Sequence, residues 1–206
     1  FLTPGRGFEC ESRQTAWEHS VASINRIAAH ARSLGVSCLL EPLQRLESNI
    51  VTNADELHAL WRALDGDDID VVLDLVAMAT AGDSVGGYFE RFGKRVAHVH
   101  VADGTPAGHL AWGDGNLPLD HHLGQLGAQG FAGTLTFELF GNGSYAQDPV
   151  AAGARPVDSR GVPQIAARWR HPFSIQTGSD RPRLHARQAH RKNAPDRGGL
   201  VRLQVR

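Results

Sequence analysis

Four ionisable side chains at the ends of apolar runs are the residues of this sequence best placed to do chemistry. Each ends or closely follows a short stretch rich in Val, Leu or Phe, and the four are Glu41, Asp74, His100 and Glu138. Two glutamates, one aspartate and a single imidazole form an oxygen-rich ligand set. Such a set suits Mn²⁺, Mg²⁺ or Co²⁺ better than a thiolate-selecting site would, and it can also hold Zn²⁺. The residue types therefore predict a divalent-metal site, provided that the fold brings the four together.

The intervals between these residues, 33, 26 and 38 positions, are those of repeated strand and helix units. Helical periodicity between the apolar runs predicts helices over residues 15–34, 53–64, 84–92 and 119–129. Strands that are nearly continuous in apolar residues are expected where helices cover a parallel sheet. One such strand end can simply be a polar residue that meets solvent. Four in succession favour the catalytic face of a (β/α) barrel, where side chains from different strands converge.

Two of the predicted helices begin at residues that commonly cap helices. Thr15 is the predicted cap of the first helix, with Glu18 three residues later. Asn53 is the predicted cap of the second, with Glu56 in its first turn. These signals fix where the chain leaves each strand connection and enters a helix.

Length and composition favour one folded domain. The chain has 206 residues, of which 41% are apolar and 21% charged, which is ordinary for a globular protein. No apolar run approaches the ~20 residues that span a bilayer, and the first residues have neither an initiator Met nor a secretory leader pattern. We therefore expect a cytoplasmic protein with no membrane partner, and a piece of a longer chain. Cys10 and Cys38 form no metal-binding or redox motif at their spacing.

Charge is distributed unevenly along the chain. Residues 154–206 hold eleven Arg and one Lys against three Asp, a net charge of +9, so residues 1–153 keep 9 basic and 19 acidic side chains, a net charge of −10. The periodicity also stops near residue 153. We therefore divide the chain into a folded part, residues 1–153, and an irregular, disordered, Arg-rich basic tail, residues 154–206. A phosphate-binding arm is the alternative for this tail, but it has few aromatic residues to stack on bases, so no nucleic-acid partner is expected.

The strand-end motifs resemble those of the xylose-isomerase-like (β/α)8 superfamily of sugar isomerases and epimerases. The matching pieces are LEPLQRLESN, VVLDL, HVHVAD and TFEL, in that order. FLTPGRG, LDLVAMA and the pair Tyr88 and Phe89 are similar to the ketose 3-epimerase branch, in particular the fructoselysine 3-epimerase type. The resemblance covers about residues 1–150. It implies an α/β fold that is the later half of a (β/α)8 TIM barrel, strands five to eight, truncated at its N-terminus.

The resemblance also implies an activity, that of a metal-dependent isomerase which epimerises a sugar by proton transfer beside a ketose carbonyl, through a metal-bound enediolate. Its divalent ion would be Mn²⁺ first, with Mg²⁺, Co²⁺ or Zn²⁺ open, held by Glu41, Asp74, His100 and Glu138. Glu41 and Glu138 would also be the two catalytic bases. His98 is expected to be a core histidine turned away from His100. The expected partner is a small-molecule sugar or ketosamine, and a homo-oligomer is left open.

Three more residues are expected to bind the substrate. The resemblance implies that Glu47 touches substrate oxygens near the carbonyl. Many relatives have a His where this chain has Ala77 and an Arg where it has Pro106. His109, in the glycine-rich loop AGHLAWGDGN, is expected to replace a lost contact, and Trp112 to stack on a sugar face. For all three, an ordinary loop residue is the alternative.

Two other functions stay open. The chain can be an inactive, truncated remnant, because a half-barrel leaves strand edges unpaired and one side of its core open. It can also be an endonuclease IV-like metal-dependent hydrolase of the same fold. That enzyme type uses three Zn²⁺ ions and needs more His ligands than these strand ends provide.

Overall fold

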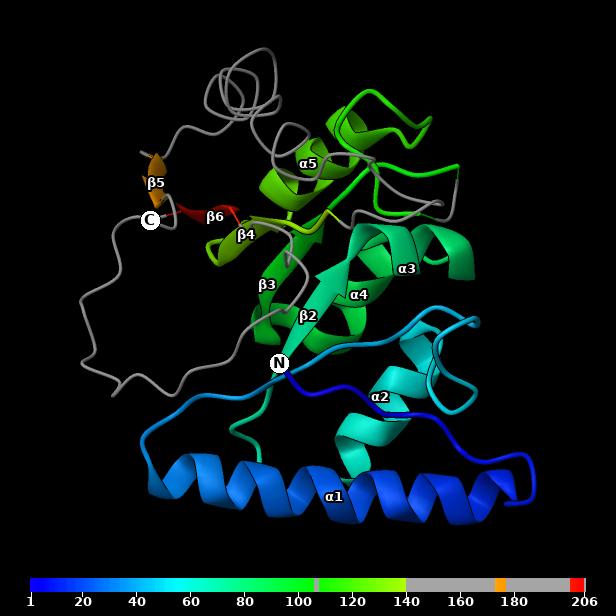
Figure 1. The fold of residues 1–206 in the computed structure, drawn as a ribbon. Helices are drawn as coiled ribbons and strands as arrows, with labels where there is room; N and C mark the ends of the chain where they lie inside the picture. The colour runs from blue at the N-terminus through cyan, green and yellow to red at the C-terminus, as the bar shows by residue number, and fades with distance from the viewer. Residues whose placement is uncertain (106–107, 140–172, 177–200, 206) are drawn as a thin grey trace, which may run out of the picture.

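Parallel strands form the centre of the structure, a computed structural model that describes residues 1–105 and 108–139 and the backbone of residues 173–176 and 201–205. The strands lie side by side in chain order, and they are β1 (Leu39–Leu40), β2 (Asp70–Asp74), β3 (Val96–Val101) and β4 (Thr134–Phe137). Figure 1 labels β2, β3 and β4 of this series. Neighbours among these four are parallel. The predicted α/β architecture is therefore confirmed.

Helices connect the strands and cover the sheet. Figure 1 shows α1 at one end of the arrangement and α5 at the other, and the helices are α1 (Arg13–Ser33), α2 (Ala54–Ala63), α3 (Leu75–Ala81), α4 (Val85–Phe92) and α5 (Leu119–Ala128). A short 3₁₀ turn, η1 (Gly93–Arg95), leads from α4 into β3. Helix α4 contacts both α2 and α5. This order places the carboxyl ends of the parallel strands on one edge of the sheet.

One of the two predicted helix caps is confirmed. The Asn53 side chain accepts a hydrogen bond from the Glu56 N–H at 2.9 Å and starts α2. The prediction that Thr15 caps the first helix is wrong. Ser12 is the cap, and its hydroxyl accepts from the Thr15 N–H at 3.0 Å. Ser12 and Thr15 are both suitable cap residues. With Ser12 as the cap, the helix also includes Arg13 to Thr15.

Helix α3 was not predicted, because its sequence shows no amphipathic pattern. It begins directly after β2, without a loop, and four consecutive residues of its first turn are buried: Leu75, Val76, Ala77 and Met78. A helix that is apolar on every side cannot be told from a buried strand by periodicity. Its start at the strand end matters for the site, since Asp74 belongs to both elements.

The core lies between the sheet and the helices. Its fully buried side chains come from strands and helices alike, and include Leu57, Leu60, Leu73, Val99 and Leu135. Burying one such Leu contributes roughly 1.5–3 kcal/mol relative to leaving it in water. Gly133 enters β4 so close to β3 that a Cβ there would lie 2.1 Å from the Ala97 carbonyl oxygen. The close approach explains why a glycine precedes this strand.

Two further strands extend the sheet beyond β4. Strand β6 (Val201–Val205) pairs with β4 in the antiparallel sense, and β5 (Phe173–Gln176) pairs with β6. Both lie in the segment expected to be a disordered tail, most of which falls outside the described residues. The division of the chain at residue 153 therefore stays a prediction.

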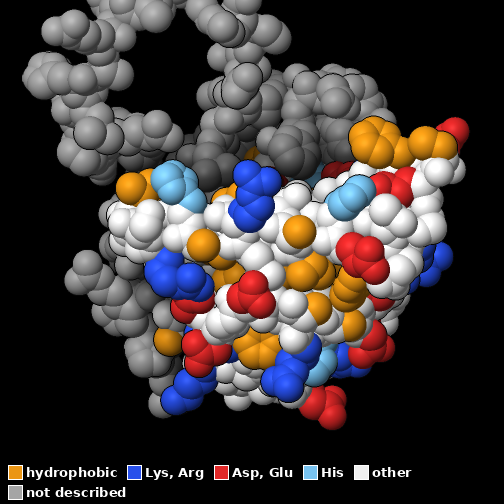
Figure 2. All heavy atoms as spheres, turned by 90° about the horizontal axis from the view of Figure 1, so that it is seen from below, with side chains coloured by type: hydrophobic (Ala, Val, Ile, Leu, Met, Phe, Trp, Pro, Cys, Tyr) orange, Lys and Arg blue, Asp and Glu red, His pale blue; other side chains and the backbone are white. Residues whose placement is uncertain are grey.

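The described helices include no membrane span, and one face of the molecule shows no dominant charge. None of the described helices has the length and hydropathy that crossing a bilayer requires. On the face that includes α1, Figure 2 shows basic, acidic and apolar side chains interspersed. Both cysteines are free, Cys10 exposed and Cys38 half-buried.

We expect Leu135→Ala to destabilise the protein by about 2–5 kcal/mol, because a fully buried side chain is replaced by a cavity. Leu46→Ala is the matched control, since Leu46 is 83% exposed, and it should change the free energy of unfolding by less than about 0.5 kcal/mol. Urea unfolding followed by tryptophan fluorescence measures both. Equal effects of the two changes would contradict the described core.

Candidate metal centre

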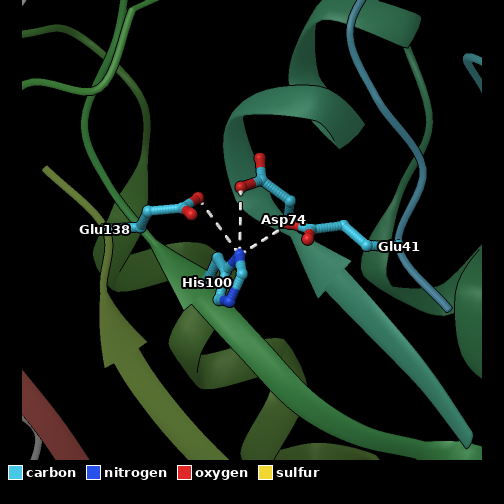
Figure 3. Close-up of side chains that lie close together, drawn as sticks. All are labelled: Glu41, Asp74, His100 and Glu138. Carbon is cyan, nitrogen blue, oxygen red and sulfur yellow. Dashed lines mark ion pairs between the residues drawn. The ribbon is translucent and has the colours of Figure 1, made fainter. Parts of the chain in front are cut away.

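Four side chains from four strand ends converge on one point. Glu41, Asp74, His100 and Glu138 each offer one ligand atom, and these atoms all lie within 4.8 Å of one another (Figure 3). The first three residues are buried and Glu138 is partly buried. The structure thus brings together all four of the residues that the sequence predicted as metal ligands.

Strand register explains this convergence. Asp74, the last residue of β2, is paired with His100 of β3. Glu138 follows β4, and its N–H donates to the Val101 carbonyl at 3.1 Å. Glu41 follows β1, and its N–H donates to the Leu2 carbonyl at 2.9 Å. Because parallel strands end at the same edge, residues one strand apart in the chain become neighbours in space.

The His100 ring lies at the centre of the group. Its Nδ1 is 2.7 Å from Glu41 Oε1, 3.1 Å from Glu138 Oε2 and 3.8 Å from Asp74 Oδ2. Figure 3 shows Glu41 and Glu138 approaching this nitrogen from opposite sides. Despite the short distances, Nδ1 makes no hydrogen bond of regular geometry. Donor atoms that point at a shared centre, and not along one another's hydrogen-bond axes, fit the coordination of a metal ion.

Charge balance in the group also fits a cation. Burial lowers the pKa of His100, but the nearby carboxylates of Glu138 and Glu41 outweigh it and raise the pKa to about 10. Burial raises the pKa of Glu41, and contact with His100 offsets this only in part. Burial also raises the pKa of Glu138. Contact with His100 and His109 outweighs this effect and holds the pKa of Glu138 well below its usual range. The buried carboxylates therefore draw positive charge into the site, which a divalent ion would supply.

Helix α3 orients the Asp74 carboxylate. Oδ1 accepts a hydrogen bond from the Ala77 N–H at 2.6 Å, so that Asp74 is the cap of the helix. Oδ2 faces His100. One oxygen is thus used by the backbone and the other is presented to the site.

His109 lies beside the four ligands. Its Nε2 is 3.7 Å from Asp74 Oδ2 and 3.5 Å from Glu138 Oε2, and the side chain is buried. Burial lowers the pKa of His109, but these two carboxylates outweigh it and raise the pKa to about 9. The sequence prediction placed His109 in the substrate pocket. The position next to two ligand carboxylates supports that prediction, although its role stays a prediction.

The other two predicted substrate contacts lie elsewhere. Glu47 is exposed, and its Oε2 accepts a hydrogen bond from the Gln44 N–H at 3.0 Å. Trp112 is partly buried against the core, with its ring 6.5 Å from that of Phe137. The contacts described for both are with their own loop or the core, and their substrate roles stay predictions.

The expectation that His98 is turned away from His100 is wrong. The two rings lie 5.0 Å apart, because residues two positions apart on a strand face the same side of the sheet. His98 is buried as expected, and its Nδ1 pairs with the Thr134 hydroxyl. The ring of Phe1 packs against both histidines, at 5.0 Å and 4.9 Å.

The sequence analysis also missed two residues near the site. Nothing in the residue pattern pointed to Phe1. Asp103 is a buried carboxylate just beyond β3 that holds the loop carrying His109. Its position directly before a glycine-rich loop was the signal that could have identified it, because such loops often close around a side chain that accepts backbone N–H bonds.

We expect Asp74→Asn to remove metal binding while preserving the fold. Asparagine can still accept the Ala77 N–H bond and cap α3, but it lacks the anionic oxygen that faces His100. At an Mn²⁺ concentration 100 times its dissociation constant, the unchanged chain should gain about 2.7 kcal/mol of stability, and the variant should gain almost none. Thermal unfolding with Mn²⁺ and with chelator measures the difference. Asp114→Asn, in an exposed part of a neighbouring loop, is the matched control and should keep the full gain.

Known 3-epimerases resemble part of this chain. Fructoselysine 3-epimerase of Escherichia coli O157:H7 is 30% identical over 126 residues, covering 60% of this chain and 46% of that protein. D-psicose 3-epimerase of Ruminiclostridium cellulolyticum is 29% identical over 124 residues, covering 60% and 41%. The chain thus spans less than half the length of these relatives.

Solved structures and a family profile agree. The structure of an L-ribulose 3-epimerase matches with a TM-score of 0.54 and 27% identity, over 64% of this chain and 43% of that chain. The D-psicose 3-epimerase from Clostridium cellulolyticum H10, solved with D-tagatose, matches with a TM-score of 0.51 and 26% identity, over 64% and 45%. The parallel part of the sheet is therefore TIM-barrel-like. The profile of the xylose isomerase-like TIM barrel family matches residues 1–157, and the chain belongs to this family.

Proposed function

We propose that this chain carries the catalytic face of a metal-dependent ketose 3-epimerase. The observation that carries the proposal is the convergence of Glu41, Asp74, His100 and Glu138 within 4.8 Å. The relatives are named as 3-epimerases of fructoselysine, psicose and ribulose. A ketose or ketosamine of similar size is therefore the proposed substrate class.

The four convergent residues would hold a divalent ion, with Mn²⁺ the first candidate and Mg²⁺, Co²⁺ or Zn²⁺ compatible with the same donors. When bound, such an ion polarises the carbonyl and its neighbouring hydroxyl and lowers the free energy of the enediolate. The chain's own residues must then fix the sugar and exclude water, so that the carbon-bound proton faces a base.

Epimerisation removes a proton from one face of a carbon and returns a proton to the opposite face, which requires two acid–base groups. Glu41 and Glu138 are the proposed pair, and their approach to His100 Nδ1 from opposite sides supports this choice (Figure 3). In one direction, one carboxylate takes the proton from C3 and the C–H electron pair moves toward the carbonyl. The other, as a carboxylic acid, then gives a proton to C3. The reverse direction exchanges the two roles.

His109 is our first candidate for a contact with substrate oxygens. Its Nε2 faces Asp74 and Glu138, and its ring comes from a different element than the ligands do. It can supply the hydrogen bond that many relatives make with a His at the position of Ala77. Glu47 and Trp112 remain the other proposed substrate-binding residues, and each would have to turn from its present contacts to reach the sugar.

We also propose that β1 to β4 correspond to strands five to eight of the barrel. Their strand ends carry the four ligands in the order that the family resemblance implies, and the chain covers 41–46% of the length of its relatives. Leu2 adds support, because it forms a parallel bridge with Leu40 on the side of β1 where strand four would lie. The other half of the barrel would then provide much of the substrate pocket.

A cytoplasmic location is our proposal for this protein. Free cysteines persist in the reducing cytosol, and both Cys10 and Cys38 are free. The small sugar substrates proposed above are consistent with this location.

We expect the Mn²⁺-loaded chain to exchange the C3 proton of a ketose with solvent. In D₂O, NMR and mass spectrometry should detect one deuterium at C3, together with the 3-epimer, for at least one of fructoselysine, D-psicose and L-ribulose. Glu41→Gln and Glu138→Gln should each lower the rate by about 10²–10⁴, because each removes an acid–base group. Glu90→Gln, at an exposed position of α4, is the control and should leave the rate unchanged.

Two results would contradict the proposed function. One is Mn²⁺-dependent stabilisation without any deuterium exchange in these ketoses, which would favour a remnant that binds metal but has no activity. The other is cleavage of abasic-site DNA by the same loaded chain, which would favour the hydrolase alternative.

A further inference from the structure

We propose that Asp103 is a positioning residue of this site, which holds the loop carrying His109 against Asp74 and Glu138. Asp103 lies two residues beyond the end of β3 and three residues after His100. Its side chain is buried, with 3% of the residue exposed. A carboxylate this deeply buried needs compensating hydrogen bonds, and the loop supplies them.

Three backbone N–H groups donate to the Asp103 carboxylate. Oδ1 accepts from Gly104 at 2.8 Å and from Leu117 at 3.0 Å. Oδ2 accepts from Gly113 at 2.9 Å. These donors lie 1, 10 and 14 residues from Asp103, so that one side chain fixes both ends of the described part of the loop.

The backbone of Asp103 reaches the residue next to His109. Asp103 and Leu110 exchange two backbone hydrogen bonds of 2.9 Å each, which form an antiparallel bridge. His109 immediately precedes Leu110. The loop also wraps closely, because a Cβ on Gly115 would lie 2.4 Å from Asp103 Oδ1. These contacts hold the backbone that directly follows His109, at Leu110, Gly113 and Leu117.

This arrangement preorganises His109. Holding a polar group in place before the substrate arrives avoids paying the ordering free energy during binding, and small misplacements of such groups reduce rates strongly. The proposed use of His109 rests on the function proposed above. Its placement by Asp103 does not, and can be tested without metal or substrate.

The first test measures the protection of His109 from diethylpyrocarbonate in the metal-free chain, by peptide mass spectrometry. Asp103→Asn keeps the size of the side chain but replaces one acceptor oxygen by an N–H₂ group that faces a backbone donor. Losing a buried charge-assisted hydrogen bond should raise the modification rate of His109 by about tenfold or more. His121, which is exposed on α5, is the internal reference and should not change. Asp114→Asn removes the same charge from the same loop and should leave His109 protected.

A second variant covers the case in which Asp103→Asn does not fold, seen as equal exposure of His109 and the buried His100. Gly115→Ala leaves the carboxylate in place but forces the loop away from it. It should raise the modification of His109 and not that of His100. Unchanged protection of His109 in Gly115→Ala, or in a folded Asp103→Asn, would overturn the proposal.

A double-mutant cycle tests whether this positioning matters for turnover. Asp103→Asn should lower kcat in the unchanged chain but have no further effect in His109→Gln, and Mn²⁺ affinity should be the same throughout. Additive losses would show that Asp103 acts independently of His109 and would overturn the proposal. If no ketose is epimerised by the unchanged chain, the proposed function fails, while the modification experiment still decides the positioning.

Discussion

The packing of three carboxylates around one buried imidazole is the constraint on which the rest of the structure depends. Glu41, Asp74 and Glu138 surround His100 at the carboxyl edge of the sheet. Like charges at such distances repel strongly when water is excluded, and they are tolerated only if positive charge enters the group. The close approach of these carboxylates therefore lowers the stability of the folded chain and favours the binding of a cation. The apolar core between the sheet and helices α1, α2, α4 and α5 must supply the stability that the site does not.

Rigid elements and tied loops keep that group in place. Three of the four ligands sit at the last residue of a strand or directly beyond it. Backbone hydrogen bonds hold them there, to the neighbouring strand for Asp74 and Glu138 and to Leu2 for Glu41. The loop after β1 is tied to the N-terminal segment: the Gly7 N–H donates to Asn49 Oδ1 at 2.8 Å, and the Ser48 hydroxyl donates to the Gly5 carbonyl at 2.7 Å. These contacts give Ser48 and Asn49 a structural role. The result is a ligand set held by backbone geometry more than by contacts between its own side chains.

The sequence predicted the ligands and most elements because their signals are local. An apolar run that ends on a carboxylate is visible without any partner, and so is a cap such as Asn53. Features that depend on residues distant in the chain were missed. Asp103 forms its bonds to Gly113 and Leu117 across a loop, and the pairing of β6 with β4 joins segments some 65 residues apart. Helix α3 was missed for a local reason, because it has no polar face to reveal it. The face of His98 could have been predicted from strand periodicity.

The two oxygens of Asp74 have different partners, and this difference bears on which ions suit the centre. Oδ1 accepts the Ala77 N–H in the first turn of α3, so that Oδ2 is the oxygen that faces His100. Ca²⁺ takes six to eight oxygen ligands and often bidentate carboxylates, whereas smaller divalent ions accept fewer donors and tolerate an imidazole. The cap of α3 thus favours an ion that accepts one oxygen from Asp74.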